Sequence, residues 1–256
     1  MFASTSLNLP NELPISGIKF PTNPLMSSAL AYTQKHTSPT TVSHCLRSAA
    51  FALIGLKKNP AFATADQDLV VLTCLLHDLG WATTPSLVSK DKRFEVDGAD
   101  LARSWLRENL PKDSTWGHRD EQLLWDAIAL HTTPSIAFHK EAEVGAVCLG
   151  ISADFFGYKL PGGLISAEEH QEIVATFPRM GFHDEVVNIL CGFCREKPET
   201  TYDNFVAVVG SVFGLDGKGG DAGGFEKRAK EHNGVVMTVL KANEEEEKAW
   251  IRGDDR

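Results

Sequence analysis

The sequence has no long apolar run, no excess of positive charge and few cysteines. None of its apolar stretches approaches the roughly 18–20 residues that span a bilayer, so no membrane association is expected. The formal net charge is −9, and an acidic surface repels phosphate backbones, so we do not expect nucleic acid as a partner. Five cysteines, an odd number, do not indicate a disulfide framework.

A secretory signal is also missing from the pattern of the first residues, which carry neither a basic segment nor an apolar one. With the cysteine usage, this predicts a cytoplasmic protein. The chain has 256 residues, of which 43% are hydrophobic and 23% charged, and this is an ordinary globular composition. A chain of this length can bury a substantial core without disulfides or other cross-links.

We find no internal repeat and no strand-like alternation, whereas apolar residues recur with a helical period along most of the chain. Caps and breakers delimit these stretches, among them Thr64 or Asp66 as an N-cap, Gly80 and Pro111. The fold class predicted is therefore all-α. The expected helices cover Ser43–Leu56, Asp66–Gly80, Asp97–Leu110, Asp120–Leu130, Glu141–Phe156, 167–177, 182–196, Asp203–Phe213 and Glu226–Trp250.

Three segments are predicted along the chain. Residues 1–26 are rich in Ser, Asn and Pro, which favours an extended N-terminal arm over a helix. Residues 27–215 form one catalytic domain. Residues 216–256, a Gly-rich loop and a charged helix, pack on that domain or extend from it. The loop 214–224 does not fit the phosphate-binding pattern G-x-x-x-x-G-K-[ST], and Cys191 and Cys194 are interpreted as small apolar residues of the core.

The most informative feature is the pair His77-Asp78 at the end of an apolar helix. A carboxylate in such surroundings is rarely buried unless it is paired or binds a metal. His44 lies at the start of the preceding apolar helix, and Asp154 lies inside a later one. If these helices pack around one core, His44, His77, Asp78 and Asp154 converge on one divalent ion. Taken singly, each has a plain alternative, a hydrogen-bonded core histidine or a carboxylate paired with arginine.

The order His44, His77-Asp78, Asp154 in helices resembles the HD superfamily of metal-dependent hydrolases, over residues 27–215. Several strings are similar to its cyanamide hydratase-like branch: Ser43-His-Cys-Leu-Arg47, Leu75-Leu-His-Asp-Leu-Gly80, Arg93-Phe-Glu-Val-Asp-Gly-Ala99, Ala127-Ile-Ala-Leu-His-Thr-Thr133 and Tyr202-Asp-Asn-Phe205. The resemblance implies an HD-type helical bundle, zinc as the cofactor, with Fe²⁺ or Mn²⁺ as alternatives, and a homo-oligomer.

The resemblance also bears on the number of metals. HD proteins with two metals place a histidine about four residues before a Gly-Ala pair, where this chain has Phe94 before Gly98-Ala99. Phenylalanine cannot bind a metal, so one metal per chain is expected. A divalent ion lowers the pKa of a bound water from 15.7 toward roughly 7. By analogy with the superfamily, Asp78 both binds the metal and accepts a proton from that water.

His131 is the best catalytic candidate outside the ligand set. It ends a helix, where a cation is favoured, and could protonate developing negative charge. A helix-capping histidine is the alternative. Thr132 and Glu95 are candidates for binding the substrate, although Glu95 could be a solvated helix-start carboxylate. Aromatic residues such as Trp81, Phe94 or Phe155 are expected to cap a small pocket, and Trp81, Phe94 and His131 are expected to contact the substrate.

The function implied by the resemblance is the hydration of cyanamide, a small-molecule substrate, to urea. The first alternative is an HD phosphohydrolase acting on a nucleotide or small phosphate ester, for which Arg47 and Arg93 could bind phosphate. Two others stay open: an HD enzyme acting on a larger substrate in specialised metabolism, and a non-enzymatic HD-fold binding module.

Overall fold

The computed structural model describes residues 7–252. It divides into two compact units, residues 1–182 and 183–256, which are described separately below. The predicted catalytic domain, 27–215, runs across this boundary. Within residues 7–252, no helix combines the length and apolarity needed to cross a membrane.

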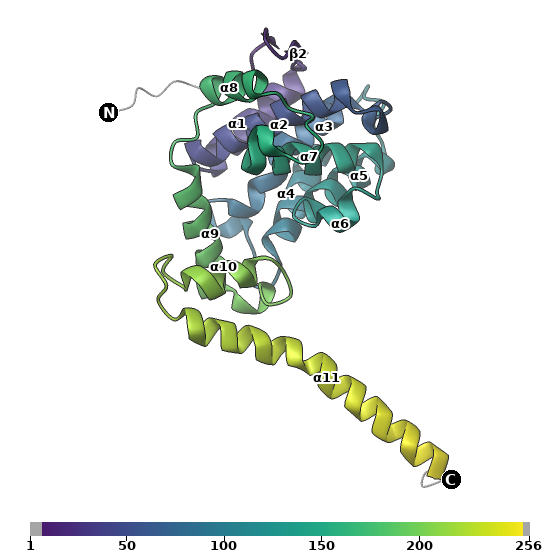
Figure 1. Ribbon diagram of the computed structural model, residues 1–256. Helices are drawn as coiled ribbons and strands as arrows, with labels where there is room; N and C mark the ends of the chain where they lie inside the picture. The colour runs from purple at the N-terminus through teal and green to yellow at the C-terminus, as the bar shows by residue number, and fades with distance from the viewer. Residues whose placement is uncertain (1–6, 253–256) are drawn as a thin grey trace. The chain divides into compact units, whose positions relative to one another are not determined.

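The first unit is a bundle of helices, so the predicted all-helical fold is confirmed (Figure 1). Short 3-10 turns connect its longer α-helices. The α-helices are α1 (Pro24–His36), α2 (Pro39–Lys58), α3 (Gln67–Leu76), α4 (Phe94–Asn109), α5 (His118–Leu130), α6 (Pro134–Ala137), α7 (Ala142–Phe156) and α8 (Ala167–Thr176). The 3-10 turns are η1 (Pro60–Phe62), η2 (His77–Trp81), η3 (Pro85–Leu87) and η4 (Gly157–Lys159).

Helix α2 runs through the centre of this unit. The Ser38 side chain caps its start by accepting a hydrogen bond from the Thr41 amide, and Pro39 occupies the first turn. Every residue from Thr40 to Gly55 is buried, as expected for a helix that is apolar on most of its surface. Helices α2 and α7 lie side by side (Figure 1), and Gly150 of α7 permits their close approach because a Cβ there would lie 2.4 Å from the Ser48 carbonyl oxygen.

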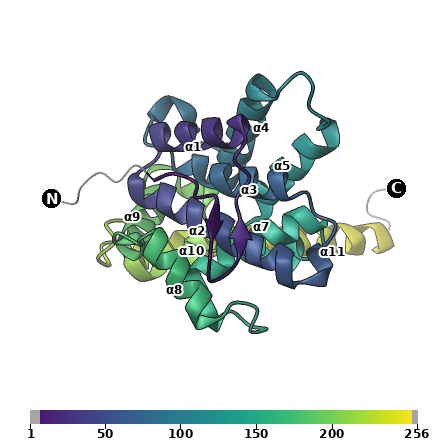
Figure 2. The same cartoon turned by 90° about the horizontal axis from the view of Figure 1, so that it is seen from above.

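A two-stranded antiparallel hairpin, β1 (Glu12–Leu13) and β2 (Ile18–Lys19), precedes the bundle. The sequence did not predict it, because strands of two residues are too short to show alternation. Leu13, Ile18 and Phe20 are buried in the main core. Figure 2 shows the hairpin lying over α2, which β2 contacts. Helix α1 then begins at Pro24, inside the segment predicted to be an arm.

The second unit contains α9 (Phe182–Glu196), which begins at the boundary, η5 (Pro198–Thr200), α10 (Val206–Phe213) and α11 (Ala222–Arg252). Cys191 and Cys194 are each 1% exposed, as core residues would be. Hydrogen bonds within the Gly-rich loop stabilise its conformation, because the Asp216 carboxylate accepts from the Lys218 and Gly220 amides.

Candidate metal centre

The His77-Asp78 pair lies where α3 changes into η2. The Asp66 side chain caps α3 by accepting from the Leu69 amide, and the α-helix ends at Leu76. The predicted continuation of this helix to Gly80 is wrong, because Asp78 has φ −97° and ψ 23° and the segment forms a 3-10 turn. The tighter turn redirects both side chains toward α2.

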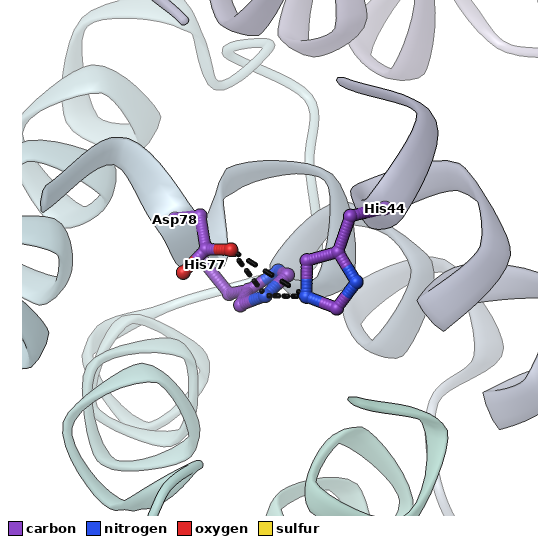
Figure 3. A group of neighbouring side chains, drawn as sticks. All are labelled: His44, His77 and Asp78. Atoms are coloured by element: carbon purple, nitrogen blue, oxygen red, sulfur yellow. Dashed lines mark hydrogen bonds and ion pairs between the residues drawn. The ribbon is translucent and has the colours of Figure 1, made fainter. Parts of the chain in front are cut away.

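Three side chains from two elements point toward one another in Figure 3: His44 of α2, and His77 and Asp78 of η2. Their potential ligand atoms all lie within 4.8 Å of each other. The two Nε2 atoms are 3.2 Å apart. The Asp78 Oδ2 atom is 3.1 Å from His77 Nε2 and 3.5 Å from His44 Nε2. All three residues are buried.

The Nδ1 atom of each histidine already makes a hydrogen bond. His77 Nδ1 donates to the Cys74 carbonyl oxygen at 2.8 Å, and His44 Nδ1 donates to Asp154 Oδ2 at 2.6 Å. In the neutral rings, both Nε2 atoms therefore present lone pairs, the form in which histidine binds metals. Two lone pairs and a carboxylate thus converge on one buried point.

This donor set fits a metal ion. Neither Asp78 oxygen has a hydrogen-bond partner although both are buried, and buried carboxylates are normally paired or bound to a metal. A tetrahedral zinc with bonds of roughly 2.0–2.1 Å separates its ligand atoms by about 3.3–3.4 Å. The three separations found here, 3.1, 3.2 and 3.5 Å, bracket that value.

Asp154 lies on the opposite side of the His44 ring and is not part of this group. Its two oxygens accept from Arg47 Nε at 2.6 Å and Arg47 Nη2 at 2.8 Å, and Oδ2 also accepts from His44. Arg47 is fully buried, and its Nη1 donates to the carbonyls of Phe177 and Pro178. In this structure Asp154 thus orients His44, while direct ligation by Asp154 stays a prediction.

The electrostatics of the group follow from burial and from these pairs. Burial favours protonated Asp154, but hydrogen bonds from His44 and Arg47 hold the pKa of Asp154 well below its ordinary value. Burial disfavours charged His77, yet the Asp78 carboxylate and Cys45 raise the pKa of His77 above its ordinary value. A bound cation would displace that proton, so metal binding should release protons.

His131, the C-cap of α5, lies beside the group, and its Nε2 atom is 4.0 Å from Asp78 Oδ1. Its Nδ1 atom donates to the Ile128 carbonyl oxygen at 2.6 Å, so in the neutral ring Nε2 has the lone pair. Burial, together with nearby His77, lowers the pKa of His131 to about 4. The neutral Nε2 of His131 can therefore accept a hydrogen bond or a proton. It can donate a proton only after it has accepted one.

Glu95 and Thr132 bind each other. Thr132 Oγ1 donates to Glu95 Oε1 at 2.7 Å, and Arg93 Nη2 donates to the same oxygen at 2.7 Å. Glu95 is buried, which contradicts the interpretation as a solvated carboxylate. Helix α4 begins at Phe94, earlier than the predicted start at Asp97, and so places Glu95 in its first turn. This network fixes the turn that follows His131.

Aromatic rings surround the histidines. Trp81 is stacked on His44 with ring centroids 6.3 Å apart and an interplanar angle of 16°. Phe94 meets the rings of Trp81 and His131 at 5.9 and 5.8 Å. The expectation that Trp81 and Phe94 lie beside the metal group agrees with this geometry, and their contact with substrate stays a prediction. Phe155 also meets the His44 ring, at 5.6 Å.

Two contributors were not singled out from the sequence for this site. Phe182 is stacked on His44 at 4.5 Å, and Arg179 contacts Asp154, with its Nη2 atom 3.3 Å from Oδ1 and also hydrogen-bonded to the main-chain carbonyl. Both come from the segment after α8, which has no metal-ligand pattern. Only its Phe177-Pro178-Arg179 composition, a cation among apolar residues, could have suggested a role.

An HD domain model matches residues 41–154, the interval that contains all four predicted ligands. No curated protein matches the chain. Residues 41–154 thus match an HD domain and contain a buried His44/His77/Asp78 group that could hold a divalent metal, and an HD domain suggests a metal-dependent hydrolase.

Proposed function

We propose that the protein is a zinc-dependent hydratase of the cyanamide hydratase type, which adds water to the nitrile carbon of cyanamide to give urea. The observation that carries the proposal is the enclosed surrounding of the metal group, in which the buried arginine and carboxylate charges are paired with one another. His44, His77, Asp78 and His131 are at most 5% exposed, and aromatic rings cover them. A buried site of this kind favours a compact, neutral substrate over a charged one.

The neighbouring cations support a neutral substrate. Arg47, which could have bound phosphate, is neutralised by Asp154 and hydrogen-bonded through all three of its nitrogens. Arg93, the other arginine considered for phosphate, is paired with Glu95. The strings similar to the cyanamide hydratase-like branch surround the same residues, which supports the same substrate.

The protein's own residues divide the work as follows. His44, His77 and Asp78 would hold the ion, which when bound supplies the Lewis acidity that makes water nucleophilic at neutral pH. Asp78 accepts the one proton that water loses as its oxygen attacks the nitrile carbon, and passes it to the unprotonated Nε2 of His131, which lies 4.0 Å from Asp78 Oδ1. His131 then returns that proton to the nitrile nitrogen, and the resulting isourea tautomerises to urea.

A phosphohydrolase is the second candidate, because an HD domain is consistent with that activity and one cation beside the site is accessible. The Arg179 side chain is 37% exposed while touching Asp154. It could turn toward a phosphate ester entering from that side.

The decisive experiment loads purified protein with zinc, confirms the metal content by mass spectrometry, and supplies either cyanamide or a panel of nucleotides and phosphate esters. We expect urea and no phosphate. The Asp78→Asn variant should lose activity, whereas His183→Ala, whose side chain is 80% exposed, should keep it. Phosphate release without urea would replace the proposal by the second candidate, and neither product from metal-loaded protein would refute both.

A further inference from the structure

The indole N–H of Trp81 is a buried donor without a partner. In the described part of the chain, the buried side-chain atoms that lack hydrogen bonds are both oxygens of Asp78, Nε1 of Trp81 and the hydroxyl of Ser48. A metal ion bound at the candidate centre would account for the Asp78 oxygens. A buried tryptophan N–H normally finds an acceptor, so this one also requires an explanation.

The position of Trp81 is fixed by its neighbours. It is the last residue of η2, three positions after Asp78, and only 9% of it is exposed. The preceding Gly80 is pressed against α4, since a Cβ there would lie 1.9 Å from the Phe94 carbonyl oxygen. The indole is held between the rings of His44 and Phe94. The unpartnered donor is therefore built into the wall of the metal site.

We propose that Trp81 donates a hydrogen bond from Nε1 to the acceptor atom of the substrate, and so selects substrates that carry an acceptor there. The inference rests on the proposed function, in which that atom is the nitrile nitrogen. When the water oxygen bonds to the nitrile carbon, one C≡N electron pair moves to the nitrogen, which then takes the proton from His131. Trp81 gives no proton away. Its dipole stabilises the charge that develops on nitrogen before that proton arrives.

If Trp81 has this role, loss of its N–H should slow the reaction without removing a hydrogen bond that stabilises the substrate-free protein. A donor that meets its acceptor only when substrate reacts contributes nothing to the stability of the substrate-free protein, where its burial is a cost. It contributes to the rate because charge on the acceptor is largest in the transition state. Removing the N–H while keeping an aromatic ring should therefore lower kcat, with no loss of stability beyond that of the smaller ring.

The test is Trp81→Phe, compared with Trp116→Phe as a matched control, both in the zinc-loaded full chain. The Trp116 indole donates to Asp66 Oδ2 at 2.9 Å, so its N–H is partnered in the substrate-free protein. Both variants lose ring volume, but only Trp116→Phe also loses a hydrogen bond of the substrate-free protein, so we expect its melting temperature to fall further than that of Trp81→Phe. For cyanamide hydration, Trp81→Phe should reduce kcat by about 10²-fold, near the lower end for loss of one such donor, with KM and zinc content little changed.

Wild-type kcat in Trp81→Phe would overturn the inference, as would a fall in melting temperature as large as that of Trp116→Phe, since the N–H would then have a structural partner. Absence of urea from zinc-loaded wild-type protein would instead refute the proposed function, and with it the nitrile as acceptor. The melting comparison requires no turnover, so the two failures are distinguishable.

Discussion

Asp154→Asn should destabilise the metal-free protein severely. Arg47 is fully buried, and the Asp154 carboxylate is the only group of opposite charge bonded to it among the described residues. An amide keeps the shape of the side chain but leaves the guanidinium charge uncompensated. Removing one partner of a buried ion pair costs about 3–5 kcal/mol. A further loss of folding stability is expected because the hydrogen bond from His44 to the same carboxylate is weakened.

The assay is unfolding by heat and by urea, followed by circular dichroism in the presence of a chelator. For a domain of this size, a shift of about 2–4 °C per kcal/mol converts the cost into roughly 6–20 °C. Asp184→Asn is the reference variant, because the Asp184 side chain is 87% exposed and its pairing with His183 should matter little. Working without metal separates the Arg47 pair from any ligation by Asp154.

The pH dependence of stability gives a second measurement. The folded pKa of Asp154 is depressed, so its contribution is fully present above the unfolded value of about 3.9 and is lost as pH falls below it. The difference between wild type and Asp154→Asn should therefore shrink from pH 5 toward pH 3. Equal stability of the two proteins at pH 7, or a gap that does not change with acid, would refute the buried pair.

Other predictions concern metal, catalysis and packing. His77→Ala should lose zinc on desalting, whereas His183→Ala should retain it, as measured by mass spectrometry; retained zinc in the first variant would contradict the ligand assignment. His131→Gln should keep zinc but lower kcat by about 10²–10⁴-fold, and unchanged kinetics would exclude a proton-transfer role. Gly150→Ala should lower the melting temperature, because its Cβ would lie 2.4 Å from a backbone carbonyl of α2. Gly234→Ala, with nothing within 4 Å, should instead stabilise the exposed helix by about 0.5–1 kcal/mol, and equal effects would contradict the packing argument.

The helices were predictable where local signals decide them. Asp66 as a candidate N-cap and the apolar residues after it were sufficient to place α3, and apolar residues with a helical period predicted most of α2 and α7. The end of α3 was not predictable, because the turn at Asp78 is followed by a tight approach of Gly80 to the backbone of Phe94, a contact between two elements that no local pattern reveals. The start of α4 was missed for a related reason, since Arg93 at its N-cap makes no side-chain capping bond.

The residues of the candidate site were likewise predictable only where the local sequence decides them. A histidine beside an aspartate on an apolar helix was enough to predict His77 and Asp78, and His44, predicted from the start of the preceding apolar helix, lies with them in the structure. The role of Asp154 could not be derived, because His44 and Arg47 lie one turn apart on α2 and both reach the same carboxylate. Sequence spacing cannot decide whether such a carboxylate turns toward a metal, an arginine or a histidine. That choice depends on distances between helices.

Charge balance around the site bears on the choice between the two candidate reactions. A phosphate ester brings at least one negative charge, and burying it requires a cation that is not already neutralised. Arg47 and Arg93 each serve a buried carboxylate, so either could bind phosphate only by exposing Asp154 or Glu95 to an uncompensated environment. Arg179 could turn away at lower cost, because Asp154 would keep both of its bonds to Arg47. A phosphohydrolase would therefore depend on Arg179, whereas hydration of a neutral nitrile would not, and Arg179→Gln separates the two by its effect on turnover.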